Sequence, residues 1–133
     1  QDIAALMLKR GVDVIIGNHP HMVQKIEFDQ SAGTLVAYSL GDFLGDAERS
    51  GSEYSIILDM EITKDNTTGE AKITGYSYTP IFTMNQAGVP LRVVRLPQAV
   101  AAYEAEYINR VSKTTYEAMT YALDRVKARI LGE

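Results

Sequence analysis

Residues 11–21 read Gly11-Val12-Asp13-Val14-Ile15-Ile16-Gly17-Asn18-His19-Pro20-His21, and this stretch decides the fold. Its apolar run, residues 12–16, has the length and the β-branched content of a buried strand. Residues 2–10 carry apolar positions at helical spacing and basic residues in the last turn, which predicts a helix that ends at Gly11. Helix, strand and the loop that opens at Gly17 form the second half of an αβ unit. Sites in open α/β sheets form at the carboxyl ends of strands.

Both histidines of the chain lie in this loop, two residues apart. Pro20 fixes its own φ and disfavours the helical region for His19, so we expect an extended segment that sends both imidazoles to the same side. Neutral imidazole is a common metal ligand and titrates near neutral pH, so a rigid His19-Pro20-His21 suits a metal centre or acid–base chemistry. A surface loop with two solvated histidines and a turn proline is the alternative interpretation.

The chain after the histidine loop is typical of β structure. Two alternating segments, residues 22–28 and 34–38, flank a polar turn that contains glycine, which predicts a hairpin. The hairpin would return residues 38–43 to the histidine loop. Gly41 permits a tight bend there, and Asp42 either hydrogen-bonds an imidazole N–H, caps local backbone or acts as a ligand.

The rest of the chain alternates polar loops with further strands and ends in helices. Residues 44–52 predict a surface loop, in which Asp46 and Glu48 are solvated or line a cleft. Further strands are predicted at 53–63, 71–82 and 91–96, and helices at 99–110 and 112–131. The fold class is therefore mixed α/β (α+β), with antiparallel hairpins and a C-terminal pair of helices.

Two pairs of side chains in this region have structural interpretations. Tyr76 and Tyr78 lie two apart on one face of a strand, where an aromatic contact across strands explains them. Arg92 and Arg95 are suitable for anion contacts, but they lie three apart and would face opposite sides of an edge strand. The pattern therefore favours solvated charges for both arginines.

Composition limits the classes of function. The 133 residues have room for one domain with a modest core, and a net charge of −4 without a run of Lys or Arg argues against a nucleic-acid-binding surface. The absence of cysteine excludes disulfides and thiolate metal sites, and no stretch is long enough to span a membrane. The chain begins at Gln1, inside a helical pattern, so we expect it to be a piece of a longer protein.

Residues 11–21, Glu27 and the segment Ala37-Tyr38-Ser39-Leu40-Gly41-Asp42-Phe43 together resemble the end of the catalytic domain in the CapA family. These are the bacterial poly-γ-glutamate capsule synthesis (PGA_cap) proteins, which resemble the calcineurin-like metallophosphatase superfamily. The resemblance implies that residues 1–133 are a single domain, the C-terminal fragment of a larger catalytic domain. An αβ and hairpin core would occupy residues 1–96, and C-terminal helices would occupy residues 97–133.

Members of that superfamily are two-sheet sandwiches flanked by helices, and they hold two divalent metals, here Mn, Zn or Fe, with Asp, Asn and His ligands at strand ends. The closing histidine pair of the family matches His19 and His21, so the resemblance implies that both are metal ligands of a catalytic site. Proton donation to a leaving group is the alternative role for either histidine. Residues with a supporting or structural role by the same likeness are Gly17, Asn18, Pro20, Glu27, Ser39, Gly41 and Asp42. The family usually has Asn at the position of Asp42, and Glu27 fits an exposed strand residue equally well.

The resemblance leaves two functions open. The first is a metal-dependent, phosphoesterase-type hydrolase or transferase that releases or attaches poly-γ-glutamate, in an extracytoplasmic, membrane-associated protein at the cell surface. The second is a non-catalytic scaffold or interaction module of a capsule-synthesis complex. A free-standing α+β binding domain, unrelated to CapA, is a third interpretation from the residues. The partners expected are the upstream part of the same domain, other capsule-synthesis proteins or poly-γ-glutamate, and a second copy of the chain, but no nucleic acid.

The ligand set is incomplete within these residues. A catalytic metal needs about three protein ligands, and two metals need more. The upstream Asp, Asn and His motifs of the family are absent, and no other histidine replaces them. We therefore expect the isolated 133 residues to bind divalent metal weakly and to hydrolyse nothing measurable.

Overall fold

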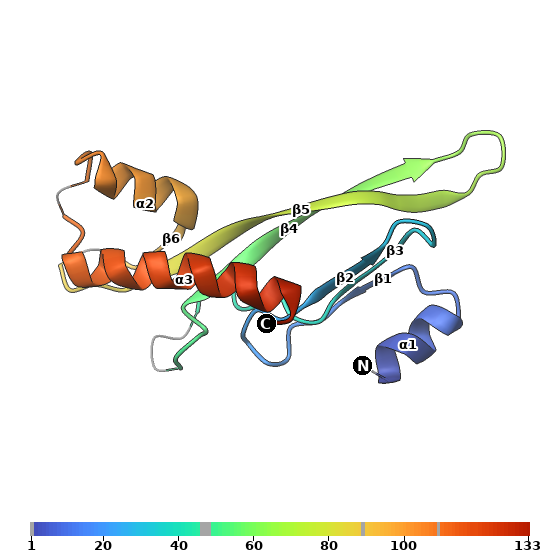
Figure 1. Cartoon of the computed structure of the whole chain (residues 1–133), viewed down its shortest axis with the longest axis horizontal. Coiled ribbons are helices and arrows are strands. Elements are labelled where there is room, and N and C mark those ends of the chain that lie inside the picture. Colours follow the sequence, from blue (N-terminus) through green and yellow to red (C-terminus); the bar gives the residue numbers. More distant parts are fainter. Residues whose placement is uncertain (1, 46–48, 89, 109) are drawn as a thin grey trace.

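The N-terminal part of the chain forms a helix and a small mixed sheet. The computed structural model describes residues 2–45, 49–88, 90–108 and 110–133. Its first elements are α1 (Asp2–Lys9), β1 (Val14–Ile16), β2 (Ile26–Asp29) and β3 (Thr34–Ala37). The strand order is β1-β3-β2, with β1 parallel and β2 antiparallel to β3 (Figure 1). The predicted helix and hairpin are confirmed, although the first hairpin strand begins at Ile26 because Val23 forms only an isolated bridge with Leu40.

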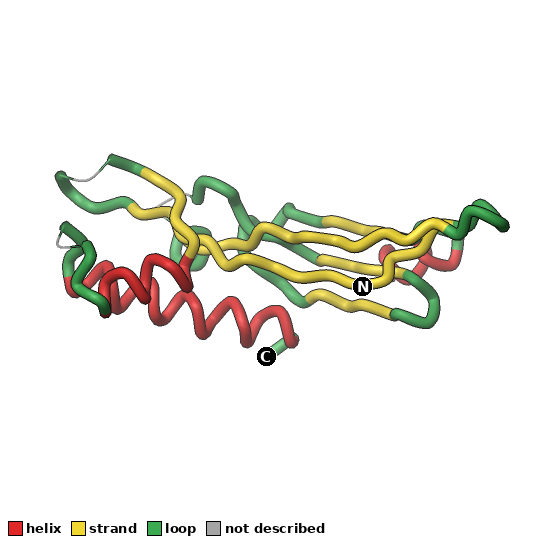
Figure 2. Tube along the Cα trace, turned by 90° about the horizontal axis from the view of Figure 1, so that it is seen from above, coloured by secondary structure: helices red, strands yellow, loops and turns green. Residues whose placement is uncertain are grey.

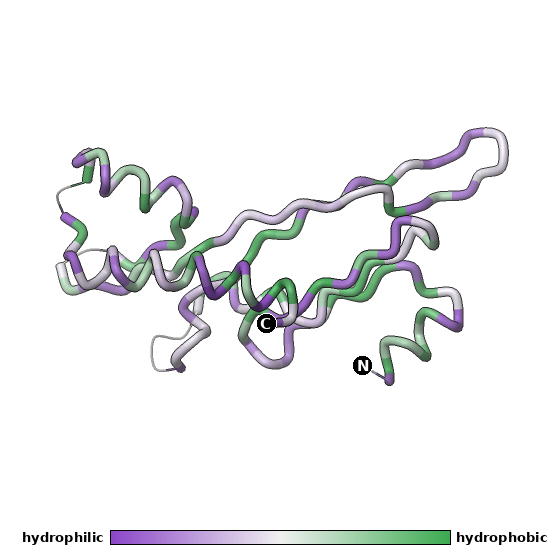
Figure 3. The backbone as a smooth tube through the Cα atoms, in the orientation of Figure 1, coloured by the Kyte–Doolittle hydropathy of each residue, from purple (hydrophilic) through white to green (hydrophobic). Residues whose placement is uncertain are grey.

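A second sheet is antiparallel throughout. It contains β4 (Tyr54–Lys64), β5 (Ala71–Met84) and β6 (Arg92–Arg95) in the order β4-β5-β6, so the predicted long hairpin and the edge strand are both confirmed. The register between β4 and β5 shifts at Glu61 and Ile62, and the tip of this hairpin projects beyond the first sheet (Figure 1). The tip is largely hydrophilic (Figure 3) and exposed, which fits a segment that no other element covers.

Two helices complete the chain, α2 (Leu96–Glu104) and α3 (Lys113–Leu131). The Ser112 side chain accepts a hydrogen bond from the Thr115 N–H, and Gly132 adopts φ 85°, so the predicted start and end of the last helix are confirmed. The helix predicted at 99–110 has different bounds, because it begins earlier, at Leu96. It ends at Glu104, because Glu106 takes the left-handed φ of 59°, which stops α-helical continuation.

The core lies between the two sheets and continues under α3. It includes Leu35 and Ala37 of β3, Tyr54 of β4 and Phe82 of β5, and α3 contributes the buried Met119. Figure 2 shows the strands running along the molecule with α3 beside them. The structure is thus a mixed α/β sandwich of two sheets with helices, as expected.

Contacts of the two tyrosines on β5 extend this core. The ring of Tyr76 meets Phe28 of β2 edge to face, with centroids 5.6 Å apart, and Tyr78 also packs against the core. The predicted aromatic contact of Tyr76 is therefore made between the sheets rather than within one sheet, because β2 lies over β5 at this point.

The outer side of the N-terminal sheet is open. β1 is an edge strand and Ile16 is 50% exposed. Helix α1 has no buried residue, although it is largely hydrophobic (Figure 3). The prediction of a fully buried strand at 12–16 is therefore wrong for the described residues, since α1 does not cover β1. None of the described helices combines the length and the apolar character needed to cross a bilayer.

Candidate metal centre at the histidine loop

Gly17 fixes the histidine loop against the end of β3. Its N–H donates to the Ala37 carbonyl at 2.8 Å, and its own carbonyl accepts from the Leu40 N–H at 3.2 Å. A Cβ at this position would lie 2.2 Å from the Tyr38 carbonyl oxygen, so only glycine allows so close an approach of the two backbones. Both backbone groups of Gly17 therefore bind the histidine loop to residues 37–40.

The His-Pro-His segment is a turn. The His21 N–H donates to the Asn18 carbonyl at 3.1 Å, and His21 adopts φ 59°. The predicted extended segment is therefore wrong, and alternation along a strand does not bring the two imidazoles together. The chain reverses here because buried Val23 must reach its bridge with Leu40. Asn18 is exposed and Pro20 is half-buried in this turn.

The side chain of His21 is held by Asp42. The Nδ1 atom of the imidazole lies 2.9 Å from both carboxylate oxygens, with the side chains of His21 and Asp42 50% and 21% exposed. A carboxylate only accepts, so the contact requires Nδ1–H as the donor, and in the neutral imidazole Nε2 then carries the free lone pair. A metal-ligating histidine ordinarily donates its other ring N–H to a carboxylate in this manner. Of the roles considered for Asp42, the structure shows the hydrogen bond to an imidazole.

Backbone packing places Asp42 for this contact. Gly41 adopts φ 77°, and a Cβ there would lie 2.8 Å from the Ser55 Cβ. The buried Ser39 accepts a hydrogen bond from the Gly41 N–H at its Oγ, at 3.3 Å, and another from the Gln24 N–H at its carbonyl. Ser39 therefore supports the bend at Gly41, and the close approach of Gly41 to Ser55 of β4 places the Asp42 loop against the second sheet.

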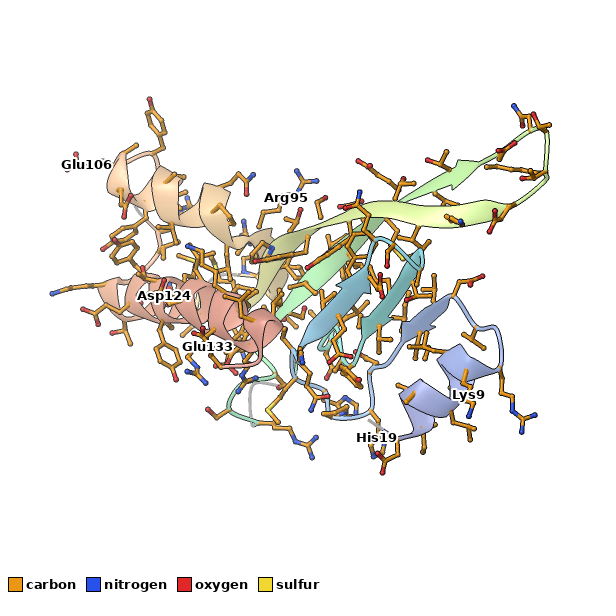
Figure 4. The ribbon with its side chains drawn as sticks, turned by 45° about the vertical axis from the view of Figure 1, so that its right-hand side comes forward. Lys9, His19, Arg95, Glu106, Asp124 and Glu133 are labelled. Atoms are coloured by element: carbon orange, nitrogen blue, oxygen red, sulfur yellow. The ribbon has the colours of Figure 1, made fainter. Side chains whose placement is uncertain are left out.

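His19 is exposed at the same loop, on the lower surface of the molecule in Figure 4. Within the described residues its ring makes no hydrogen bond or ion pair. The imidazole is thus free to bind a ligand, but nothing orients it as Asp42 orients His21. Asp46 and Glu48 of the following loop lie outside the described residues.

Glu27 belongs to a different cluster. Its carboxylate accepts from the Tyr38 hydroxyl at 3.0 Å and pairs with the Lys25 ammonium at 2.7 Å. The Lys25 contact and then the Tyr38 hydrogen bond lower the pKa of Glu27, and burial and Glu27 raise the pKa of Tyr38. The structure does not bond Glu27 to either histidine. The sequence signal for this cluster is the spacing of two between Lys25 and Glu27 along one strand face.

The two histidines could supply part of the ligand set of a metal site. His21 presents a free Nε2 on a ring fixed by a carboxylate, and His19 lies two residues away in the same turn. Within the described ranges, no group of three His, Cys, Asp or Glu side chains is arranged to hold a metal ion. The histidine loop could therefore supply ligands to a centre, and further donors would have to come from outside these residues.

Comparisons with known proteins agree with the resemblance of this loop. Residues 1–47, which include His19, His21 and Asp42, match the family model described as bacterial capsule synthesis protein PGA_cap. Through these residues, the chain is similar to the bacterial capsule synthesis proteins of the PGA_cap family. Two curated proteins named CapA are also similar to it. No solved structure matches the chain.

The first relative is the PGA biosynthesis protein CapA of Bacillus subtilis (strain 168), 34% identical over 74 residues. The second is the capsule biosynthesis protein CapA of Bacillus anthracis, 33% identical over 66 residues. The matches cover 56% and 50% of this chain, but only 19% and 15% of the two relatives. The chain thus corresponds to a small part of the proteins it resembles.

Proposed function

We propose that the chain supplies the histidine-bearing part of a metal-dependent, phosphoesterase-type hydrolase that acts in the biosynthesis of a poly-γ-glutamate capsule. The observation that carries the proposal is the contact of the His21 Nδ1 with both Asp42 oxygens. Asp42 lies 21 residues from His21 in the sequence, on the bend at Gly41, and its contact fixes the His21 ring in the way expected of a metal ligand. The similarity of residues 1–47 to the PGA_cap family model and of the chain to CapA of Bacillus subtilis supports the biosynthetic context.

The residues of this chain would bind and orient the metal. His21 would ligate through Nε2, and Asp42 would fix the ring and raise the basicity of that nitrogen. His19 would ligate from the same turn. A divalent ion bound there, Mn, Zn or Fe, would supply Lewis-acid activation of water and charge stabilisation at a phosphoester. The exposed position of both rings leaves the site open to solvent and to a neighbouring segment.

The remaining donors would come from the upstream part of the same domain. The open outer side of β1 and α1, with exposed Ile3, Leu6 and Ile16, is the surface where that part would pack. We expect the isolated 133 residues to show no measurable hydrolysis. An extracytoplasmic, membrane-associated location at the cell surface is part of the proposal and follows from the family resemblance.

A scaffold role in a capsule-synthesis complex is the second candidate. The same exposed apolar residues of α1 favour it, because such a face suits a protein interface as well as a domain interior. The two functions differ in whether they require a bound metal, since a scaffold needs none.

The experiment is a calorimetric Mn²⁺ and Zn²⁺ titration of the complete polypeptide that carries this chain. Wild type is compared with His19→Ala and His21→Ala, and with Gln30→Ala in the exposed β2–β3 turn as a control. The hydrolase proposal predicts metal binding and phosphodiesterase activity in wild type and the control, and weaker binding and activity in each histidine variant. Absence of metal binding in all four proteins would contradict the hydrolase proposal and leave the scaffold role as the remaining candidate.

A further inference from the structure

A cavity of about 590 Å³ lies where β6 joins α2. Arg92, Arg95 and Arg110 all line it. The prediction that Arg92 and Arg95 face opposite sides of the edge strand is therefore wrong, because Arg95 lies where the strand turns into α2. All three arginines are exposed, so water can solvate their guanidinium groups and they do not by themselves indicate a ligand.

A second cavity, of about 570 Å³, lies beside the histidine loop and is within the usual size range of ligand sites. It is lined by residues 22–25, Tyr38, Arg129, Gly132 and Glu133. Figure 1 shows the C-terminal end of α3 next to the loop that joins β1 to β2. Met22 follows His21 directly, so the cavity borders the proposed metal site, although neither histidine is among its described lining residues.

Arg129 carries a buried nitrogen that lacks an acceptor. Its Nη1 atom is buried and makes no hydrogen bond in the described part of the chain. Among the same residues, no acidic side chain forms an ion pair with Arg129. A buried charged donor without an acceptor costs free energy, and such a group in a native protein indicates a missing water molecule or ion. Arg129 therefore differs from the solvated arginines of the first cavity.

Two contacts fix the guanidinium group of Arg129 at the cavity. Its Cζ atom lies 5.2 Å from the centre of the Tyr54 ring, which is buried in the core. Gly51 brings the backbone close on another side, because a Cβ there would lie 3.3 Å from Arg129 Nη2 and 3.1 Å from Met22 Sδ. The guanidinium group is thus positioned before any ligand binds, which lowers the entropy that a ligand contact would cost.

Lys25 brings a second positive charge to the cavity. Its stem lies against the end of α3, because a Cβ at Gly132 would lie 3.3 Å from Lys25 Cδ. The ammonium pairs with Glu27 at 2.7 Å through one of its three N–H groups, so the others can bind a ligand. Glu133 is the one acidic residue among the described lining residues.

We propose that this cavity binds a phosphate group between Arg129 and Lys25. The oxygens of one phosphate can accept from the guanidinium fork and from the ammonium at once, and its double charge balances both cations. A carboxylate has two oxygens and a single charge, so it satisfies the pair less well. Nη1 gains its acceptor when the unbranched side chain of Met22 shifts, which such a side chain does readily.

The C-terminal end of α3 opposes an anion, but only weakly. A helix end carries about half an elementary charge, and its effect is smaller than that of the two full positive charges. The last carbonyls, of Ala128 and Arg129, already accept from the backbone N–H groups after the helix. Phosphate binding here requires no metal, so the proposal goes beyond the hydrolase function and does not depend on it.

The test is a calorimetric titration of the complete polypeptide with inorganic phosphate, with EDTA present so that no metal contributes. Wild type should bind, and Arg129→Gln should bind at least about tenfold more weakly. The control Lys127→Gln removes the same charge from an exposed position on the same helix and should bind as wild type. His21→Ala should also bind phosphate as wild type, which separates this cavity from the metal site.

A second variant keeps the test valid if Arg129→Gln misfolds. Glu133→Gln removes the negative charge at the cavity and should tighten phosphate binding about twofold, a gain that a folding defect cannot produce. Unchanged or weaker binding by Glu133→Gln would count against the proposal.

Four further results would overturn the proposal. They are no phosphate binding by wild type, an equal loss in Lys127→Gln, an equal loss in His21→Ala, and equally strong binding of acetate. The second would show a response to net charge alone, and the third would place the phosphate at the histidine loop. Loss of metal binding with phosphate binding retained would contradict the hydrolase proposal alone.

Discussion

The two terminal helices of the chain differ in what their apolar residues contact. α3 buries Met119, Ala122, Val126 and Ile130 against the sheets, whereas α1 buries none of its residues and leaves Ile3 75% exposed. Both helices have an apolar face in the sequence. The difference shows that an amphipathic pattern predicts a helix but does not tell which surface the helix covers.

The largest expected difference in stability is between alanine substitutions of two methionines, one on each helix. Met119 of α3 is fully buried and Met7 of α1 is 38% exposed. Met119→Ala should lower the free energy of unfolding by about 2–5 kcal/mol, because it leaves a cavity in the core. Met7→Ala should cost no more than about 0.5 kcal/mol in the same 133 residues. Urea unfolding measures both, and equal losses would mean that α1 is packed as firmly as α3.

The open face of α1 and β1 should also cause association. Exposed apolar residues beside an unpaired strand edge favour pairing of two copies, so we expect the 133 residues to self-associate. Leu6→Gln should weaken the dimer by about tenfold, or roughly 1.4 kcal/mol, and Leu131→Gln at the far end of α3 should not. Sedimentation velocity measures this, and a monomer at high protein concentration would contradict it.

The smallest effect concerns the polar contacts of Glu27 on β2 with Lys25 and Tyr38. Lys25 and Tyr38 lower the pKa of Glu27 from its usual value of 4.5, so the charged carboxylate stabilises the fold above that pH. This contribution is lost as the pH falls through the lowered pKa. Glu27→Gln should therefore cost no more than about 0.5 kcal/mol at neutral pH, with the difference from wild type vanishing in acid. Thermal unfolding at several pH values measures it, and a constant difference would argue against the ion pair.

Local patterns predict most of the elements but not their long-range contacts. Alternation and turn residues predict the β2–β3 and β4–β5 hairpins, and Ser112 and Gly132 predict the ends of α3. The turn at His19 was not predictable from Pro20, because the bridge of Val23 to Leu40 reverses the chain there.

The candidate sites were predictable to different degrees. A hydrogen bond from an imidazole to Asp42 is one of the roles that the sequence allows. The structure shows that the partner is His21 and that the bend at Gly41 positions the carboxylate. A cavity where β6 joins α2, lined in part by Arg92, Arg95 and Arg110, was not predictable. It depends on where β6 turns into α2 and on the hydrogen bonds from Ser112 and Thr115 to the Gln86 side chain. Neither site follows from composition alone.

We propose that Asp42 orients the His21 imidazole so that it can bind a metal. The most direct test of this proposal is the Mn²⁺ affinity of the complete polypeptide with Asp42→Ala and Asp42→Asn, each checked for native circular dichroism. Asp42→Ala should weaken Mn²⁺ binding about 10–100-fold, and Asp42→Asn should weaken it much less, because its amide oxygen still accepts the imidazole N–H. Wild-type affinity in Asp42→Ala would contradict it.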